Sequence, residues 1–374
     1  MSLSNLPYTI TSLHPLRAEI NLDALRKNWL TLQAIAGEAK LLAVVKANAY
    51  GHGSVRIAKE LIVLGADRLA VANLLEGIEL REAGIDVPIL VLSAPLNQML
   101  GAYARYRLGV TVSSVDVARA VADTASSTGP LTVHVKVDTG MTRLGLLPGE
   151  VAETLELLRR AKGVHVEGIL THYATVDHDF TLRQSSLFDD LVDSLEDPPR
   201  LIHGANSGTL LYTPETVRGK ALVRVGGALF GLLSPQLEEA ASVQLQPVMK
   251  LVSRVVHLRD IEAGTSVSYG RTWIAEQSTR IATIAAGYGD GLPRSLSNSG
   301  EVGIKGKRYP IVGRVCMDMF MVDLGQDRVI QVGEEVVLFG PGGPSAVEAA
   351  GTAGTIAYDL TTGLTPRVPR VYVG

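Results

Sequence analysis

The 374-residue chain contains a single cysteine, Cys316, so no disulfide can form within it. Such a low cysteine content suits a reducing cytosol. The formal net charge is only −3, which disfavours bulk electrostatic binding of nucleic acid or of acidic membranes. No apolar run reaches the roughly 18 residues of a transmembrane helix, and residues 1–10 lack the basic start and apolar core of a signal peptide. These absences favour a cytoplasmic enzyme as the default expectation.

Hydrophobic residues make up 46% of the sequence, which is enough to form a sizeable folded core. Its length suggests two domains, or one large barrel with an appendage. Asn21 is placed to cap a first helix that ends at Gly37. The apolar residues of this helix recur at helical spacing, namely Leu22, Leu25, Trp29, Leu32 and Ile35.

Eight short apolar or alternating segments follow, with room for a helix between neighbours. We expect strands at residues 41–45, 68–71, 89–92, 109–112, 132–137, 166–170, 201–203 and 222–225. Repeated βα units predict a parallel sheet, and eight units predict a closed (β/α)₈ barrel, which we place at residues 17–240. A doubly wound open sheet is the alternative, because periodicity does not reveal closure.

The pattern changes near Ser234, where residues 234–247 are typical of a linker. Beyond it, strands without regular helices are predicted at residues 249–257, 280–286, 301–304, 311–315, 320–323 and 335–339. We therefore expect a mainly β domain over residues 241–374. Residues 1–16 lie outside the barrel repeat and could add a strand to either domain.

Unusual polar residues fall at the predicted C-terminal ends of the strands, where barrels of this kind carry reactive groups. Lys46 ends the first strand, and its amine can form a Schiff base with a carbonyl compound once its proton is removed. A lysine at a strand end is, by itself, far more often a surface residue. The same predicted rim also carries His134, Lys136, Asp138, Arg143, His172, His203, Asn206, Ser207, Arg224, Gly226 and Gly227.

The segments after the seventh and eighth strands indicate a phosphate site, because these loops are the usual phosphate cradle of such barrels. The Ser207 hydroxyl and the backbone N–H groups at Gly226 and Gly227 are donors with little bulk around them. The alternative is that the two glycines merely turn the chain. A reactive lysine beside a phosphate cradle outlines a pyridoxal-phosphate site.

Segments between Val44 and Arg370 resemble, in order, those of the alanine racemase family of barrel-fold pyridoxal-phosphate enzymes. They are VVKANAYGHG, KVDTGMTRLG, THYATVD, HGANSGT, RVGGALFG, VSYG, GYGDGLPR, VGRVCMD and RVPR. The resemblance implies a (β/α)₈ barrel followed by a mainly β domain. It also implies a cytoplasmic isomerase that interconverts L- and D-alanine with pyridoxal 5'-phosphate and supplies D-alanine for peptidoglycan. The implied assembly is a head-to-tail homodimer with shared active sites, with no metal, nucleic acid or membrane partner.

The resemblance also assigns roles to individual residues. Lys46 matches the Schiff-base lysine, which is also one acid–base group, and Tyr269 matches the second base on the opposite cofactor face. Cofactor contacts are assigned to Tyr50, His172, Asn206, Ser207, Arg224, Gly226, Gly227 and Tyr358. Arg143 and Met317 match groups that hold the substrate carboxylate, and His203, Lys136 and Asp318 match a surrounding shell. Asp177, Tyr288, Arg294 and Arg314 match the corridor through which substrate enters.

These assignments make chemical sense. Racemisation needs a carbon acid deprotonated on one face and reprotonated on the other, so two bases must flank a planar carbanion. Lysine and tyrosine both have ordinary pKa values near 10 and need help from nearby cations. Arg224 matches the partner of the pyridine nitrogen, and because arginine only donates hydrogen bonds, that nitrogen should stay neutral.

Lys136 carries a separate hypothesis, because it should point into the same rim as Arg143 with no obvious counter-charge. In some family members the matching lysine is carbamylated by CO₂, which converts a cation into an anion that can pair with the arginine. The alternative is an ordinary lysine paired with Asp138.

Two positions depart from the family pattern. Gly227 stands where a branched apolar residue is usual, and Phe230 stands where tyrosine is common, but both leave the ligand set intact. In the family the residue matching Tyr269 comes from the other chain of the dimer, although the sequence is also compatible with a site within one chain.

Three other functions remain open. A barrel-fold amino-acid decarboxylase would favour a carboxylate at the pyridine nitrogen, which Arg224 opposes. A non-catalytic pyridoxal-phosphate carrier would resemble the first half of the chain but would lack a counterpart of Tyr269. A racemase of broader specificity, acting on serine or larger side chains, is the third, because pocket volume cannot be inferred from sequence.

Overall fold

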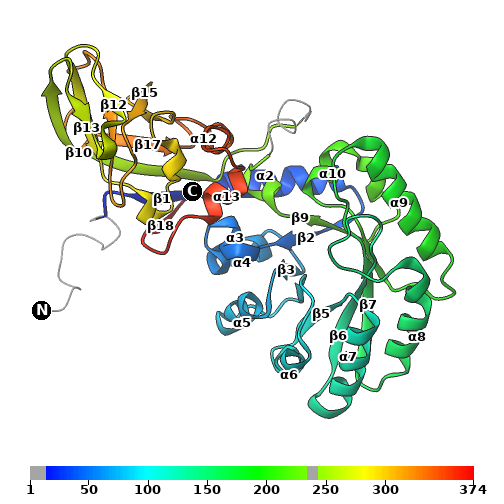
Figure 1. Cartoon of the computed structure of the whole chain (residues 1–374). Helices are drawn as coiled ribbons and strands as arrows, with labels where there is room; N and C mark the ends of the chain where they lie inside the picture. Colours follow the sequence, from blue (N-terminus) through cyan, green and yellow to red (C-terminus); the bar gives the residue numbers. More distant parts are fainter. Residues whose placement is uncertain (1–13, 234–242) are drawn as a thin grey trace, which may run out of the picture. The chain divides into compact units, whose positions relative to one another are not determined.

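The computed structural model describes residues 14–233 and 243–374 (Figure 1). Most of the predicted linker at 234–247, and most of the N-terminal segment 1–16, therefore lie outside the described residues. The chain forms two compact units. One contains Arg26–Leu229 with residues 243–245, and the other contains Gln246–Gly374 with residues 14–25 and 230–233.

The first unit is built on eight parallel strands (Figure 1), and each predicted strand is found to within two residues at either end. They are β2 (Lys40–Val44), β3 (Leu69–Val71), β4 (Ile89–Val91), β5 (Leu108–Val112), β6 (Leu131–Lys136), β7 (Val164–Leu170), β8 (Leu201–His203) and β9 (Leu222–Val225). Their order is β8-β7-β6-β5-β4-β3-β2-β9. Hydrogen bonds from Ala221 N to Ile202 O and from Arg224 N to Ala205 O bring the edge strands β8 and β9 together. The sheet is thus a nearly closed barrel, as predicted.

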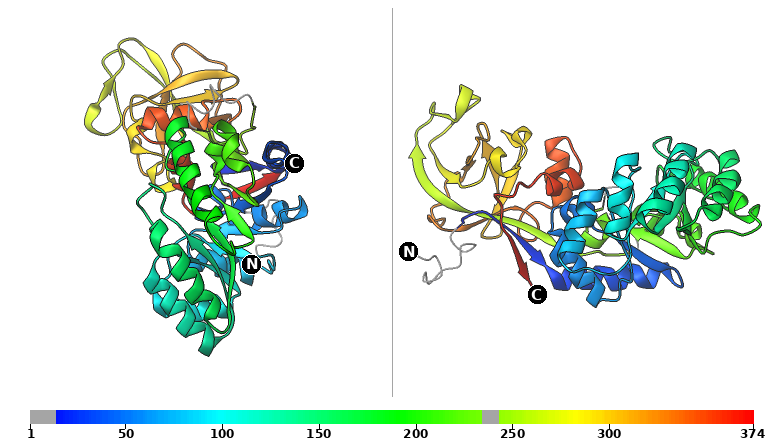
Figure 2. Two further views of the ribbon diagram at one scale, coloured as in Figure 1. Left: turned by 90° about the vertical axis from the view of Figure 1, so that its right-hand side faces the viewer. Right: turned by 90° about the horizontal axis from the view of Figure 1, so that it is seen from below.

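Helices lie along the outside of these strands (Figure 2). They are α2 (Leu22–Ala36), α3 (Lys46–Tyr50), α4 (Ser54–Val63), α5 (Leu74–Glu82), α6 (Leu100–Arg105), α7 (Val115–Thr128), α8 (Val151–Arg160), α9 (His178–Asp193) and α10 (Ser207–Tyr212), with short 3₁₀ turns at η2 (Asn97–Met99), η3 (Pro148–Glu150), η4 (Pro214–Val217) and η5 (Gly227–Phe230). Asn21 accepts a hydrogen bond from Ala24 N at the start of α2, so the predicted cap is confirmed. None of the described helices is long and apolar enough to cross a membrane.

The second unit is a mainly antiparallel sheet of order β13-β16-β15-β14-β17-β10-β1-β18. Its strands are β1 (Arg17–Asn21), β10 (Met249–Ile261), β13 (Thr279–Ile284), β14 (Glu301–Ile304), β15 (Lys307–Val312), β16 (Phe320–Asp323), β17 (Glu335–Phe339) and β18 (Arg370–Val373), beside a small pair, β11 (Ser266–Val267) and β12 (Trp273–Ile274). Two helices, α12 (Ala346–Ala353) and α13 (Ala357–Thr362), and the turns η6 (Tyr269–Arg271), η7 (Tyr288–Asp290) and η8 (Arg294–Leu296) complete it. A mainly β second domain was predicted, and the structure has one.

The boundary between the units differs from the predicted division at 17–240. Strand β1 pairs with β10 and β18 in the second sheet, so Arg17–Asn21 does not belong to the barrel. Its alternating burial, with Ala18 and Ile20 inside, is that of a strand with one face on a core. A strand near the start of the chain, β1, therefore joins the second sheet, and it begins at Arg17.

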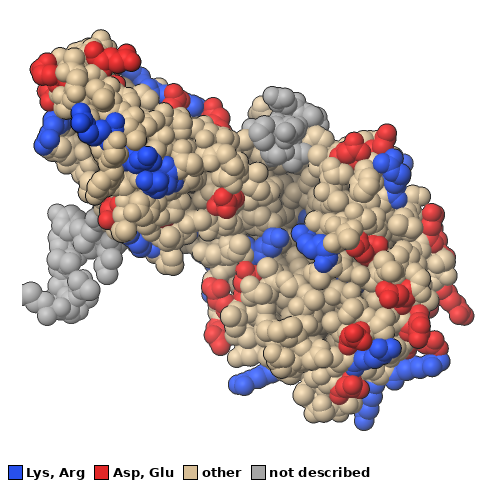
Figure 3. Space-filling view, viewed as in Figure 1, with Lys and Arg blue, Asp and Glu red and all other residues tan. Residues whose placement is uncertain are grey.

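Charge is dispersed over the face of the molecule drawn in Figure 3. Basic and acidic side chains are interspersed there without a broad region of one sign. This agrees with the small net charge of −3.

Candidate active site

Lys46 follows β2 directly and stands on an unusual turn. Ala47, Asn48, Ala49 and Tyr50 have φ angles of 51°, 54°, 52° and 53°, so four consecutive non-glycine residues are left-handed. The left-handed region costs an L-residue roughly 1–2 kcal/mol. Backbone strain of this kind persists only where the surroundings enforce it, and it is commonly found at functional sites.

Side chains from neighbouring loops hold this turn in place. The Glu76 carboxylate accepts hydrogen bonds from Ala47 N at 2.8 Å and from Ala72 N at 2.6 Å. The Asn48 side-chain oxygen accepts a hydrogen bond from Ser54 N at 2.8 Å. Glu76 was not among the predicted site residues. From the sequence it is only an acidic residue in the first turn of a helix, and nothing in the sequence pairs it with Lys46.

Arg224 lies buried on β9 and is held on several sides. One terminal nitrogen donates to His203 Nδ1 at 2.9 Å, and the other lies 3.0 Å from His172 Nδ1. The carbonyl oxygens of Thr171, His203 and Gly204 accept further hydrogen bonds from the same two nitrogens. No described residue forms a hydrogen bond with Nε, so its N–H is the donor left over for a ligand. Burial lowers the pKa of Arg224 to about 10, which still leaves it charged at neutral pH.

Ser207, Gly226 and Tyr50 meet where strands β8 and β9 end. The Ser207 hydroxyl oxygen accepts a hydrogen bond from Gly226 N at 2.9 Å, and Gly227 begins the turn η5. A Cβ atom on Gly226 would collide with the Tyr50 hydroxyl, so the glycine is needed for this close approach. The predicted phosphate cradle thus has small groups and a hydroxyl gathered at one place.

Four cationic side chains influence one another in this unit, namely Lys46, Lys136, Arg143 and Arg224. Burial, followed by the charge of Arg143, lowers the pKa of the half-buried Lys46 amine, although the Glu76 carboxylate opposes the shift. Burial, with the charges of Arg224 and Arg143, lowers the pKa of Lys136 to about 7. Among residues 14–233 and 243–374, no carboxylate forms an ion pair with any of the four. Cations without an ion-paired carboxylate favour the binding of an anion.

The neighbouring polar residues fit this environment. Burial, with the charges of Arg224 and Lys136, lowers the pKa of His172 to about 2, so this ring is neutral at physiological pH. Asp138 was the predicted partner of Lys136 in the alternative to carbamylation; it forms no ion pair with Lys136, although its charge raises the pKa of that amine. Instead, its Oδ1 accepts hydrogen bonds from the backbone N–H groups of residues 140, 141 and 142 at 2.9, 3.0 and 3.1 Å. Lys136 itself is 5% exposed.

The second unit brings together the predicted second base and three of the four predicted corridor residues, Tyr288, Arg294 and Arg314. Tyr269 begins η6 and is 73% exposed. The preceding Ser268 hydroxyl donates to the Arg314 carbonyl at 2.7 Å, which joins this turn to the loop at 313–318. Tyr288, whose side chain is exposed, donates its backbone N–H to the Cys316 carbonyl at 3.0 Å in that same loop.

Other predicted residues of this unit lie on or beside the same loop. Met317 is 53% exposed, and its carbonyl accepts a hydrogen bond from Gly289 N at 2.8 Å. Asp318 forms an ion pair with Arg367 at 2.7 Å. Arg294 begins η8, which lies beside this loop.

Three predicted site residues have local structural partners. Asp177 caps α9 by accepting a hydrogen bond from Phe180 N at 2.8 Å. Asn206 caps α10 by accepting from Gly208 N at 2.9 Å. The Tyr358 hydroxyl in α13 donates to the Leu232 carbonyl at 3.1 Å. These contacts explain part of why each residue type is present, and they leave its predicted role in ligand binding open.

Comparison with known proteins covers both units. The family model "Alanine racemase, N-terminal domain" matches residues 20–234, and "Alanine racemase, C-terminal domain" matches residues 248–372. The alanine racemase of Desulforamulus reducens is 42% identical over 370 residues, covering 96% of this chain and 99% of that protein. The crystal structure of alanine racemase from E. faecalis matches with a TM-score of 0.91 at 35% identity, covering 98% of this chain and 100% of that chain. A structure of alanine racemase from Bacillus anthracis with bound L-Ala-P matches with a TM-score of 0.89 at 33% identity, covering 99% and 96% of the two chains.

The matches span both units, and their order along the chain agrees with the order of the motifs. Strand-end residues of the barrel, the exposed tyrosine of the second unit and the sheet that carries it all fall within the matched ranges. The chain belongs to the alanine racemase family.

Proposed function

We propose that this protein is an alanine racemase that interconverts L- and D-alanine with pyridoxal 5'-phosphate. The observation that carries the proposal is the group of four cations in the barrel unit without a carboxylate ion-paired to any of them. A phosphate ester and an amino-acid carboxylate are anions of the kind such a site requires. The small groups at Ser207 and Gly226, with the Tyr50 hydroxyl above them, fit the phosphate end.

The residues of the barrel unit fit the rest of the cofactor. Lys46 would hold its aldehyde carbon, because burial favours the neutral, nucleophilic form of this amine. The unengaged Nε–H of Arg224 would donate to the ring nitrogen. When bound, pyridoxal phosphate supplies an electron-accepting ring that makes the α-hydrogen of an attached amino acid acidic.

The chain itself must then move one proton on each face of the α-carbon. Lys46 Nζ would take or return the proton on one face and Tyr269 Oη on the other, while Arg143 and Met317 hold the carboxylate. Arg224 would keep the ring nitrogen unprotonated, which favours return of the proton to the α-carbon over side reactions. The decarboxylase alternative loses support because no carboxylate among the described residues contacts Arg224.

Carbamylation of Lys136 is part of this proposal. At a pKa of about 7, much of the amine is neutral at physiological pH and can attack CO₂. The nitrogen–carbon bond forms, the amine loses one proton to solvent, and the side chain becomes an anion among three cations. Electron density for three extra atoms on Nζ would support this, and clean density for a bare amine would exclude it.

We further propose a homodimer in which Tyr269 of one copy serves Lys46 of the other. Lys46→Ala and Tyr269→Ala chains, each inactive alone, should regain part of their activity when mixed. A site formed within one chain would regain none. The D-alanine product would feed peptidoglycan synthesis in the cytoplasm, a location that the lone free thiol at Cys316 favours.

The direct test is the loss of optical rotation of L-alanine, L-serine and L-lysine in turn, with and without added pyridoxal phosphate. Alanine should racemise, and Lys46→Ala and Tyr269→Phe should each lose about 10²- to 10⁴-fold in rate, as expected for acid–base groups. Activity on lysine but not alanine would instead favour the racemase of broader specificity. An Asp179→Asn variant is a suitable control, because this exposed residue lies outside the proposed site.

A further inference from the structure

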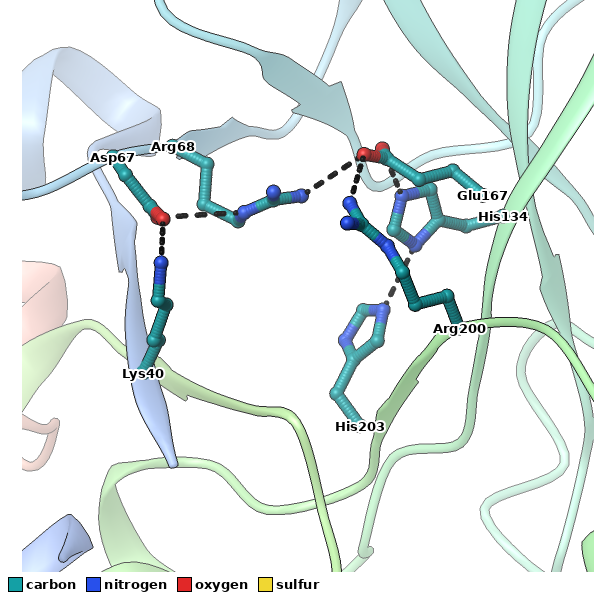
Figure 4. Close-up of polar contacts among 7 residues, drawn as sticks. All are labelled: Lys40, Asp67, Arg68, His134, Glu167, Arg200 and His203. Carbon is teal, nitrogen blue, oxygen red and sulfur yellow. Dashed lines mark hydrogen bonds and ion pairs between the residues drawn. The ribbon is translucent and has the colours of Figure 1, made fainter. Parts of the chain in front are cut away.

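A line of buried polar side chains leads from Arg224 away from the proposed cofactor site. His203 Nδ1 lies 2.9 Å from the Arg224 guanidinium, and His203 Nε2 lies 2.9 Å from His134 Nδ1. His134 Nε2 in turn lies 3.1 Å from a carboxylate oxygen of Glu167 (Figure 4). The two imidazoles meet edge to face, and they are 3% and 0% exposed for His134 and His203.

Only one arrangement of protons satisfies every contact in this line. An arginine can only donate, so His203 Nδ1 must accept, and a neutral His203 then carries its proton on Nε2. That proton points at His134 Nδ1, which must accept, so His134 carries its own proton on Nε2. The Glu167 carboxylate accepts the last hydrogen bond. A cation fixes the direction of the line at one end and an anion fixes it at the other.

The charges agree with this arrangement. Burial and the charge of Arg224 hold the pKa of His203 well below its ordinary value, and burial lowers the pKa of His134 despite the nearby carboxylate. The hydrogen bond from His134 and the charge of Arg68 lower the pKa of Glu167 below its ordinary value. Both rings are therefore neutral and the carboxylate is ionised at physiological pH.

Two arginines also hold the Glu167 carboxylate in place. Arg68 lies 3.4 Å from its other carboxylate oxygen, and Arg200 lies 3.9 Å from the same oxygen (Figure 4). A cavity of about 230 Å³, lined in part by Arg68, His134 and Glu167, opens at this end of the line. Substitutions at Glu167 therefore change the line without touching the proposed cofactor contacts.

We infer that Glu167 and His134 are positioning residues for Arg224. By fixing the tautomer of His203, they keep a hydrogen-bond acceptor in front of the buried guanidinium. This inference rests on the proposed function only in taking Arg224 as the partner of the cofactor ring. The tautomers of His134 and His203 follow from contacts within this chain and do not depend on the proposed function.

Glu167→Leu removes the terminal acceptor, whereas Glu167→Gln keeps an acceptor oxygen without the charge. Glu60→Leu is the matched control, because Glu60 is also a largely buried carboxylate paired with two arginines, Arg26 and Arg56, on helices outside the line. The measurement is ¹⁵N NMR of the ring nitrogens in full-length, histidine-labelled protein carrying pyridoxal phosphate. It is made alongside kcat and KM for both alanine enantiomers.

Wild type, Glu167→Gln and Glu60→Leu should show His134 and His203 as neutral rings protonated on Nε2. Glu167→Leu should lose this single pattern at both rings. Its kcat should fall about 10- to 100-fold, the usual cost of removing the hydrogen-bond partner behind a working histidine. KM should change little. The loss in kcat/KM should be equal in both directions because the two enantiomers have equal free energy. Glu167→Gln should recover most of the rate.

Two results would overturn the inference. One is a Glu167→Leu protein with unchanged ring signals and rate. The other needs no variant, and it is a wild-type His203 protonated on Nδ1 or on both nitrogens at neutral pH. A wild-type protein that shows the predicted ring signals but does not racemise alanine would refute the proposed function and leave the proton arrangement standing.

Discussion

The left-handed turn that carries Lys46 can be weakened through Glu76, whose carboxylate accepts two backbone hydrogen bonds at 2.8 and 2.6 Å. Glu76→Gln keeps the shape but supplies only one acceptor oxygen, so its NH₂ group must face a backbone N–H. A hydrogen bond to a charged group contributes about 1.5–3 kcal/mol, and the variant should lose about that much stability in the barrel unit. The strain of the turn, roughly 1–2 kcal/mol per residue, would then be opposed by fewer contacts.

Urea unfolding followed by circular dichroism measures this loss, and absorbance titration of the apoprotein with pyridoxal phosphate measures its effect on the site. The same free energy sets the largest expected loss of cofactor affinity at about 10- to 150-fold. Ala47→Gly in the Glu76→Gln background should restore part of the stability and part of the cofactor affinity, because glycine adopts the left-handed conformation without steric cost. Glu82→Gln, an exposed change at the end of the same helix, is the control.

The charge that Glu76→Gln removes has a second, opposite effect. The Glu76 carboxylate raises the pKa of Lys46, so its loss should lower that pKa further and free the amine at more acid pH. Stability should therefore fall while the titration of Lys46 moves to lower pH. A variant with wild-type stability, cofactor affinity and Lys46 titration would refute the idea that this carboxylate holds the turn.

Three further predictions concern contacts elsewhere in the barrel unit. Gly226→Ala should displace the Tyr50 hydroxyl and weaken pyridoxal-phosphate binding about 5- to 10-fold, and an unchanged absorbance titration would contradict this. Gly168→Ala should push its new methyl group into the His134 ring and lower the urea stability by about 1–3 kcal/mol, and unchanged unfolding would show that the ring can move aside. The hydrogen bond from His134 and the charge of Arg68 lower the pKa of Glu167, so its contribution of at most about 3 kcal/mol is present above pH 4.5 and lost as the pH falls towards 2; acid unfolding curves of wild type and Glu167→Gln should converge there.

Gly149→Ala is the control for both glycine substitutions. Its Cβ would meet no atom within 4 Å, and the backbone there needs no left-handed angle. It should behave as wild type in both assays. A loss of similar size in this variant would mean that the effects at Gly226 and Gly168 are not caused by close contacts.

The barrel was predictable because its strands are buried on both faces. Segments such as Leu69–Val71 and Ile89–Val91 therefore form short apolar runs that stand out between helices. Strands β1 and β18 were missed for the opposite reason. Their pairing joins the two ends of the chain, from Ala18↔Arg370 to Asn21↔Val373, and no local pattern reveals a partner so distant in sequence.

Some features of the candidate site could likewise be predicted from the sequence, and others could not. Residues such as Lys46, Ser207 and Arg224 could be placed on one rim because the C-terminal ends of parallel strands lie together. The turn after Lys46 could not be foreseen, since Ala-Asn-Ala-Tyr contains no glycine and is ordinarily right-handed. The partner of His134 was equally hidden, because Glu167 reaches it only through the register that sets His134 opposite Gly168.

The buried histidines clarify why two acid–base groups suffice in the proposed mechanism. A racemase must return the proton only where its two bases stand, so any other acid near the α-carbon would open a competing path. Burial and the surrounding cations lower the pKa of His172 to about 2 and hold that of His203 well below its ordinary value, so neither ring can donate as an imidazolium at neutral pH. The cations that would hold the anionic ligands therefore also keep the neighbouring histidine rings neutral. Proton transfer is left to Lys46, whose pKa is lowered by burial and by the charge of Arg143, and to Tyr269.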